Sequence, residues 1–385
     1  MAFYERSRSR GNIFYLSITV AFIVTLLTLW LGLLSYTTPF PAAPPHQEPV
    51  AADDDSHHES ADIQNPENLI QLQPQFFTDL GSKRVQIKYG PFTVPGSGTN
   101  NGMKDFVDEK ATKPCDDCLI TYMRAGLQYP DGANANANTG MWLHHVVLLD
   151  TAVPDTVCPK DRKGRPVPNR FFASGNERTA MDLSGASTIQ TGYFLSAQSQ
   201  VVVTLELMNQ MAEAREAVLT VEYEFIPSPI PKSFKHAKSI WLDIGGYCGN
   251  SEASVPNDTS TFDFNMQPGW KVPDGWEENL LVFLGGHLHD GGTHLEAMKS
   301  GGIFCDSAAT YGANDDFIDG TGEKMAHISN MSLCHKATTL KAGDELSVKA
   351  YYDKTAHPMM VDADASLEPV MGIAILYAAQ SEGGN

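Results

Sequence analysis

The chain has 385 residues, of which 42% are hydrophobic, and its formal net charge at pH 7 is −19. This length and composition are sufficient for two domains of ordinary size. The acidic balance argues against a nucleic-acid partner and against adsorption to anionic lipid, because both interactions need a basic surface. We expect the charge to serve solubility in an extracellular or vacuolar setting.

The first feature along the chain is an apolar run without charges, residues 13–34. At about 1.5 Å per residue, this run can cross the roughly 30 Å of hydrocarbon in a bilayer. Arg6, Arg8 and Arg10 precede it, so the positive-inside rule places the N-terminus in the cytosol. We predict a cytosolic tail over 1–12, a signal anchor over 13–34, and a single-pass protein with the rest of its chain lumenal or extracellular. A cleavable signal peptide is the competing interpretation, and it would deliver the chain to the same side.

Six cysteines fit an oxidising compartment, and their even number predicts three disulfides. We expect Cys305 to pair with Cys334. Cys115 and Cys118 form a CxxC motif that could serve redox or zinc chemistry, but no second CxxC accompanies it, and a disulfide is favoured. Two glycosylation sequons begin at Asn257 and Asn330.

Residues 35–75 are rich in proline and in acidic side chains, and this composition predicts a disordered linker. The adjacent His57 and His58 could bind a metal. A solvated tether is the favoured interpretation, because the segment cannot bury a core.

From residue 76 onward, short apolar runs bounded by Gly, Pro, Asn and Asp predict an all-β fold. Their spacing favours two tandem antiparallel, jelly-roll-like β-sandwiches over alternating strands and helices. A Pro-rich stretch, 226–232, would separate a first sandwich over 76–232 from a second over 233–385. Residues 208–217 could form a helix or a long turn. The expected strands are 85–89, 142–149, 200–207, 218–225, 239–244, 279–283, 345–352 and 370–378.

His144 and His145 lie in the middle of the apolar run 141–149. Two imidazoles are costly in a buried strand unless they are paired or bind a metal. Adjacent side chains on a regular strand point to opposite faces, so a shared metal would need a local twist or bulge. Two separately satisfied histidines and a metal-binding pair both stay open for this motif.

His287 and His289 are better placed for a metal, because residues at i and i+2 share one face of a strand. Glycines on either side of the pair let a backbone or a ligand approach closely. Glu296 follows too late for the spacing of a cupin. His294 is a further candidate ligand.

Met371 begins the third motif, near the start of the last expected strand. A thioether combined with imidazoles suits Cu(I), although a methionine in such a strand more often belongs to the core. In order and type, His144-His145, His287-x-His289 and Met371 resemble the type II copper, ascorbate-dependent monooxygenases, such as the peptidylglycine and dopamine hydroxylases. The resemblance spans residues 85–380. The segments 90–95, 114–119, 286–292 and 370–374 look closer still to the stress-upregulated nodulin-like branch, found in plants and fungi.

This resemblance implies two sandwiches and two copper sites that are well separated across a wet cleft. A copper on His144 and His145 would store and pass an electron. A second and more secure copper, on His287, His289 and Met371, would bind O2 and attack a substrate C–H bond, with ascorbate as the reductant. The resemblance assigns neither the substrate nor catalytic residues beyond these ligands.

The chain departs from the hydroxylases in three respects, one of which is that no cysteine follows Met371. Gly285 stands where the peptide hydroxylases hold a substrate carboxylate with an arginine, so a peptide with a C-terminal glycine is not the expected substrate. The stretch 203–209 contains no histidine where the family supplies a third ligand to the first copper. Candidates to replace that ligand are Glu206, Met208 and Asn209.

The sequence thus predicts a membrane-anchored copper protein, a monooxygenase by resemblance, with a small-molecule or secreted substrate. One alternative is a non-catalytic copper-binding stress-response protein of the same fold. Another is a glycosylated adhesion module whose histidines occur by chance. Ascorbate-driven O2 consumption distinguishes the first, and copper binding separates the second from the third.

Overall fold

The structure, a computed structural model, describes residues 68–246, 248, 251–276, 278–312, 327–334, 338–361 and 366–380. All of these residues belong to one compact unit. The predicted cytosolic tail, the signal anchor and most of the predicted linker lie outside the described residues. Within the described ranges, no helix has the length and apolar character needed to cross a membrane.

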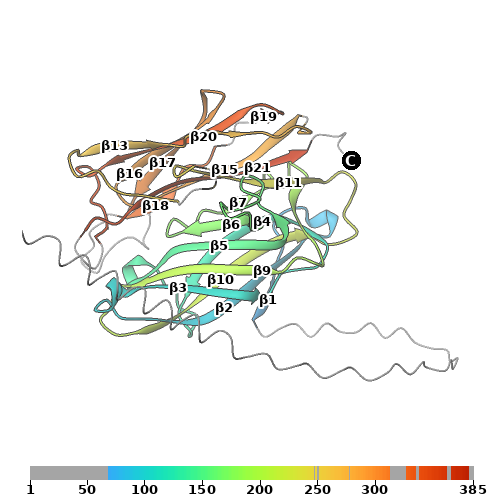
Figure 1. The fold of residues 1–385 in the computed structure, drawn as a ribbon. Coiled ribbons are helices and arrows are strands. Elements are labelled where there is room, and N and C mark those ends of the chain that lie inside the picture. The colour runs from blue at the N-terminus through green and yellow to red at the C-terminus, as the bar shows by residue number, and fades with distance from the viewer. Residues whose placement is uncertain are drawn as a thin grey trace, which may run out of the picture. The chain divides into compact units, whose positions relative to one another are not determined.

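The fold is all-β, as the sequence predicts (Figure 1). Each of the expected strands coincides with a strand of the structure, and residues 210–214 form a turn rather than a helix. Short 3-10 helices are η1 (Thr78–Leu80), η2 (Asn100–Gly102) and η3 (Ala137–Thr139). The strands are β1 (Leu69–Leu72), β2 (Lys83–Val94), β3 (Met103–Ala111), β4 (Cys118–Gln128), β5 (Met141–Pro154), β6 (Pro168–Gly175), β7 (Met181–Asp182), β8 (Thr191–Leu195), β9 (Val201–Asn209), β10 (Arg215–Ile226), β11 (Lys235–Asp243), β12 (Glu252–Ala253), β13 (Thr261–Asn265), β14 (Trp270–Lys271), β15 (Asn279–Leu288), β16 (Gly292–Lys299), β17 (Gly302–Tyr311), β18 (Ile328–Met331), β19 (Thr338–Leu340), β20 (Glu345–Asp353) and β21 (Val370–Gln380).

One long sheet runs through both halves of the described chain, in the order β1-β2-β10-β4-β8-β11-β21-β15-β19. The halves join where β8 and β11 pair in parallel. A sheet of order β3-β9-β5-β6 belongs to the first half, and one of order β13-β20-β16-β17-β18 to the second (Figure 1). The two predicted sandwiches therefore share a sheet instead of standing as separate tandem domains.

Each half of the long sheet has its own hydrophobic core. In the first core, β2, β4 and β10 of the long sheet pack against β5 and β9. In the second core, β11, β15 and β21 of the long sheet pack against β16, β17 and β20. Full burial of one large aliphatic side chain stabilises the fold by about 1.5–3 kcal/mol. Each core therefore stabilises the half of the chain to which it belongs. Examples of fully buried members are Ile87, Leu143, Leu207 and Leu219 in the first core and Leu242, Leu295, Val348 and Leu376 in the second.

β21 is buried on both of its faces. Ala374 and Leu376 belong to the second core, whereas Ile375 and Tyr377 pack with the first. This position explains why the strand reads as a continuous apolar run instead of an alternation. Because alternation gives Met371 the same face as Ile375, the methionine is directed toward the first half of the chain.

The predicted linker is wrong at its C-terminal end. Residues 68–75 do not form a disordered tether, because Leu69–Leu72 form β1 and pair antiparallel with β2 at the edge of the long sheet. The strand is short and its middle residues are exposed, so its composition gave no sign of burial. Pairing supplies the backbone hydrogen bonds that make it a strand.

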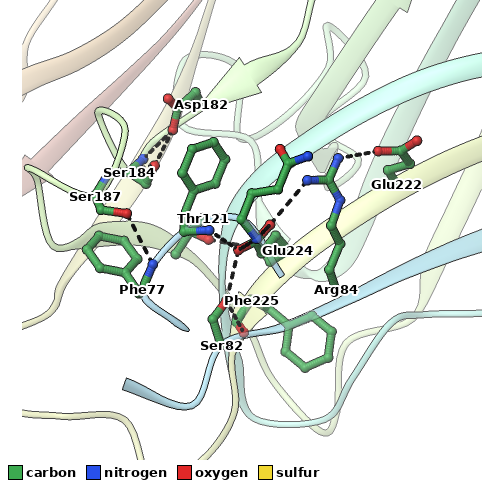
Figure 2. Close-up of polar contacts among 12 residues, drawn as sticks. Phe77, Ser82, Arg84, Thr121, Asp182, Ser184, Ser187, Glu222, Glu224 and Phe225 are labelled. Carbon is green, nitrogen blue, oxygen red and sulfur yellow. Dashed lines mark hydrogen bonds and ion pairs between the residues drawn. The ribbon is translucent and has the colours of Figure 1, made fainter. Parts of the chain in front are cut away.

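A buried glutamate fixes the segment that follows β1 (Figure 2). Glu224 is fully buried and accepts hydrogen bonds from the backbone N–H groups of Gln75, at 2.9 Å, and Phe76, at 2.5 Å. The Ser82 hydroxyl donates to the same carboxylate at 3.2 Å, and Arg84 forms an ion pair with it at 3.4 Å. A buried carboxylate is tolerated only with such compensation.

We expect Glu224→Gln to lower the free energy of unfolding by about 2–4 kcal/mol, because an amide cannot accept from all of these donors and adds N–H groups facing them. Denaturant unfolding measures the loss. Glu222→Gln is the matched control, since Glu222 also pairs with Arg84 but its side chain is 26% exposed. Its expected loss is below about 1 kcal/mol. Equal losses in the two variants would show that burial of Glu224 does not matter.

The structure contains three disulfides, and the predicted pairing of Cys305 with Cys334 is confirmed. No free cysteine is found among the residues described. Disulfides persist in oxidising compartments, so the folded part of the chain belongs to a lumenal or extracellular environment. The other two pairs are Cys115–Cys118 and Cys158–Cys248.

Replacing Cys305 and Cys334 together with serine should lower the free energy of unfolding by about 3–4 kcal/mol in a loop-entropy model. The reason is that the bridge spans 29 residues and restricts the unfolded chain. Serine replacement of Cys115 and Cys118, which are 3 residues apart, should cost less than half as much. Denaturant unfolding of the two double variants compares them, and a larger loss from the short bridge would contradict the entropic explanation.

Candidate metal centre

His144 and His145 lie on β5 at a β-bulge. In the pairing of β5 with β9, Leu143 is opposite Leu207, whereas His145 is opposite Glu206. His144 is therefore an extra residue in the ladder, and such a bulge interrupts the alternation of side chains. The local distortion that a shared metal would need is thus present at this histidine pair.

Both imidazoles reach one carboxylate oxygen. Glu206 Oε2 lies 2.8 Å from Nδ1 of His144 and 2.9 Å from Nδ1 of His145, and the two Nδ1 atoms are 3.2 Å apart. Of the three candidates for the missing third ligand, Glu206 is therefore the residue that lies at the histidine pair. Met208 packs in a separate apolar cluster, and Asn209 donates hydrogen bonds to loop carbonyls.

His287 lies near the end of β15, which pairs with β21, and His289 directly follows the last residue of this strand. His145 Nε2 lies 3.0 Å from His289 Nε2, and the rings of His145 and His287 have centroids 5.1 Å apart. His144, His145 and His289 each offer a ring nitrogen within 4.8 Å of the others. The two pairs form one cluster, whereas the family resemblance implied two sites held apart.

Hydrogen bonds fix the orientation of three of the rings. Nδ1 of His289 lies 2.7 Å from the Pro369 carbonyl oxygen, which can only accept, so Nδ1 carries the proton and Nε2 presents a lone pair. Glu177 Oε1 lies 3.2 Å from Nδ1 of His287 and orients that ring in the same way. His145 has its glutamate contact at Nδ1 as well. A carboxylate or carbonyl on Nδ1 is the usual partner of a histidine that binds a metal through Nε2.

Two observations show that these residues suit a metal ion. The buried Nε2 of His287 has no hydrogen-bond partner among the described residues, and a buried nitrogen left unpaired costs about 1–3 kcal/mol. The 3.0 Å between the Nε2 atoms of His145 and His289 matches two donors that each lie about 2.0–2.1 Å from one ion. Imidazole nitrogens with nearby carboxylates suit copper among other transition metals.

His144 differs from the other rings, because both of its nitrogens face carboxylates. Its Nε2 lies 3.3 Å from Glu368 Oε1, and its Nδ1 contacts Glu206. Burial lowers the pKa of His144, but the hydrogen bonds and charges of the two glutamates outweigh burial and raise the pKa to about 10. Burial and the neighbouring His144 charge lower the pKa of His289 to about 4, and hold the pKa of His145 well below its ordinary value. Without metal, His144 is therefore an imidazolium, and a metal must displace its proton to use this ring.

The sequence did not single out two of the glutamates, Glu177 and Glu368. Their side chains are only 5% and 9% exposed, and each contacts a histidine of the cluster. Glu177 lies just after β6 and Glu368 just before β21. Neither has a fixed spacing to a histidine, so only the tertiary structure reveals them.

A small cavity of about 30 Å³ is lined by all four histidines of the cluster, and two larger cavities adjoin the cluster. An apolar cavity of about 170 Å³ is lined by His145, His287 and Met371 among others. The structure therefore brings Met371 to the wall that carries His287. A more polar cavity of about 280 Å³ is lined by His144, Glu206 and further glutamates. The cluster thus has one apolar and one acidic approach.

The further candidate His294 and two other histidines have partners outside the cluster. His294 and His357 each stack on a tyrosine ring and do not join the cluster. His327 Nδ1 lies 2.5 Å from Asp290 Oδ2, and that carboxylate also accepts from a backbone N–H group. Each of these three rings therefore has a partner outside the histidine cluster.

No known protein-family model matches the chain. "Probable copper-dependent oxygenase M1" of Phoma sp. is 33% identical over 323 residues, which cover 83% of this chain and 76% of that protein. "Probable copper-dependent oxygenase clz3" of Cochliobolus lunatus is 34% identical over 255 residues, covering 66% of this chain and 77% of that protein.

Similarity to solved structures is weak. N-glycanase F covers 78% of this chain and 96% of its own at 10% identity, with a TM-score of 0.39. Capsid protein P2 of bacteriophage PM2 covers 74% of this chain and 100% of its own at 8% identity, with a TM-score of 0.24. Nothing about fold or activity follows at this level. The two sequence relatives are far closer, and their extent and identity show that the chain belongs to the family of copper-dependent oxygenases.

Proposed function

We propose that the protein holds one copper ion at the histidine cluster and uses O2 to hydroxylate a C–H bond of its substrate. The observation that carries this proposal is the meeting of the two histidine pairs, with His145 Nε2 and His289 Nε2 3.0 Å apart. His287 is the favoured third ligand, because its buried Nε2 has no other partner among the described residues. Met371, on the same cavity wall, would be a weak and soft additional ligand.

His144 has a different proposed role. Both of its nitrogens face glutamates, so its charge offsets theirs and leaves His145 oriented by Glu206. If His144 bound the metal, it would first have to leave Glu368 or Glu206. His144, His145 and His289 each have a ring nitrogen within 4.8 Å of the others, and His287 is not in this group. His144 and His287 are therefore alternative third ligands, and each needs its own test.

Copper, when bound, would supply the redox chemistry with O2. Hydroxylation consumes one O2, two electrons and two protons, inserts one oxygen atom and releases the other as water, so an external two-electron reductant such as ascorbate is required. Glu177, Glu206 and the Pro369 carbonyl would keep three imidazoles in the tautomer that binds a metal. The apolar walls beside His287 would exclude water from the reacting bond.

We also propose that residues 13–34 anchor the protein, with the folded part on the lumenal or extracellular side. The three disulfides support the side. Asn257 and Asn330, the two sequon asparagines, are exposed and accessible to glycosylation. We further propose that the protein belongs to the nodulin-like branch, which the segments 90–95, 114–119, 286–292 and 370–374 support.

Metal analysis and O2 uptake test this function in the full-length protein. We expect copper to be bound, and ascorbate to drive more O2 consumption than the same copper does in solution. Bound copper without consumption would favour the alternative, a non-catalytic copper-binding stress-response protein. Failure to bind copper would contradict both and favour an adhesion module.

A further inference from the structure

The apolar cavity has a wall built by strand alternation. Met371, Ile373 and Ile375 lie at every second position of β21, and Gly285 and His287 do the same on β15. One face of two paired strands thus supplies both the apolar surface and a metal-facing ring.

Other lining residues come mainly from the first half of the chain. Val147 on β5 and Phe172 and Ala173 on β6 line the cavity, and Trp241 contributes from β11 in the second half. Most of the lining belongs to packed strands, whereas Glu177, Thr179 and Ser251 come from loops, so the apolar walls have a defined shape.

The lining carries little charge. Glu177 is its only carboxylate among the described residues, and it is engaged with His287 and with the Gly175 N–H group. The described lining contains no Lys or Arg, so an anion would find no counter-charge there. Thr179 Oγ1 is buried and unpaired among the described residues, and it can form one neutral hydrogen bond.

Size limits what can enter. The cavity measures about 170 Å³. A dry protein cavity of about 150 Å³ lined by aliphatic and aromatic side chains binds benzene. We propose, on the basis of the function proposed above, that the substrate inserts an uncharged apolar group of about one aromatic ring, or a hydrocarbon chain of equal volume, beside His287. The rest of the substrate lies outside this cavity.

Three fluorinated probes of similar size test this inference in the metal-free full-length protein: 4-fluorotoluene, 4-fluorobenzoate and 4-fluorobenzylammonium. Fluorine NMR titration gives the dissociation constant of each. We expect 4-fluorotoluene to bind at least about tenfold more tightly than either ion, because burying an unpaired charge is costly. Equal or tighter binding of an ion, or no binding of 4-fluorotoluene, would overturn the inference.

Two variants locate the bound probe. Ala173→Phe fills the cavity from β6 and Val147→Phe from β5, and each should abolish binding of 4-fluorotoluene. Ile303→Phe is the matched control, since Ile303 is 57% exposed and lies outside the lining. If a folded cavity variant binds 4-fluorotoluene as tightly as the parent does, the probe does not bind in this cavity and the inference is overturned. If one of the two cavity variants does not fold, the other alone provides the test. The titration uses no copper, so its outcome is independent of whether the protein is an oxygenase.

Discussion

Replacing His289 with alanine is expected to abolish high-affinity copper binding and the ascorbate-driven O2 consumption that depends on it. His289 presents Nε2 to His145 at 3.0 Å and is oriented by the Pro369 carbonyl. Alanine removes a strong nitrogen donor, so the loss should exceed the roughly 10–100-fold that removal of an outer partner causes. Competition with a Cu(I) chelator measures the affinity.

His294→Ala is the control for this variant. It removes the same side chain only a few residues away, on β16, where the ring stacks on Tyr351 instead of joining the cluster. Copper affinity should be unchanged in this control. If His289→Ala binds copper as the parent does, the cluster is not the copper site.

Replacing Glu206 with alanine is expected to lower copper affinity by about 10–100-fold, although Glu206 is not a proposed ligand. One of its oxygens contacts Nδ1 of both His144 and His145, so its loss frees both rings and leaves the His144 charge with Glu368 alone. The same chelator competition measures this effect. Unlike His289→Ala, this variant should keep measurable copper binding.

Glu216→Ala is the matched control for Glu206, because Glu216 is an exposed carboxylate on β10. It removes one negative charge without touching a histidine. A similar loss in both variants would mean that general charge, and not orientation of the rings, determines the affinity.

Much of the fold could be predicted because the buried strands are apolar. The strands β5, β15 and β21 are apolar in sequence, whereas the segments that flank them are polar. β3 does not, because its sequence MKDFVDEKA is charged and mostly exposed at the sheet edge. The junction of the halves was also hidden, since β8 and β11 pair through only a few residues.

The site could be predicted in its parts but not in its assembly. The four histidines, His144, His145, His287 and His289, were singled out from local spacing, and Met371 from the order of motifs in the resembled family. The approach of His145 to His289, 144 residues later, depends on how the halves pack and on a bulge that alternation alone does not place.

The number of copper ions per chain tests the central claim most directly, that the two histidine pairs form one centre. Titration of the full-length protein with Cu(I) should give one tightly bound copper per chain, and His145→Ala and His289→Ala should each remove it. Two tightly bound coppers in the parent, with one retained in each variant, would contradict the claim and restore two separate sites.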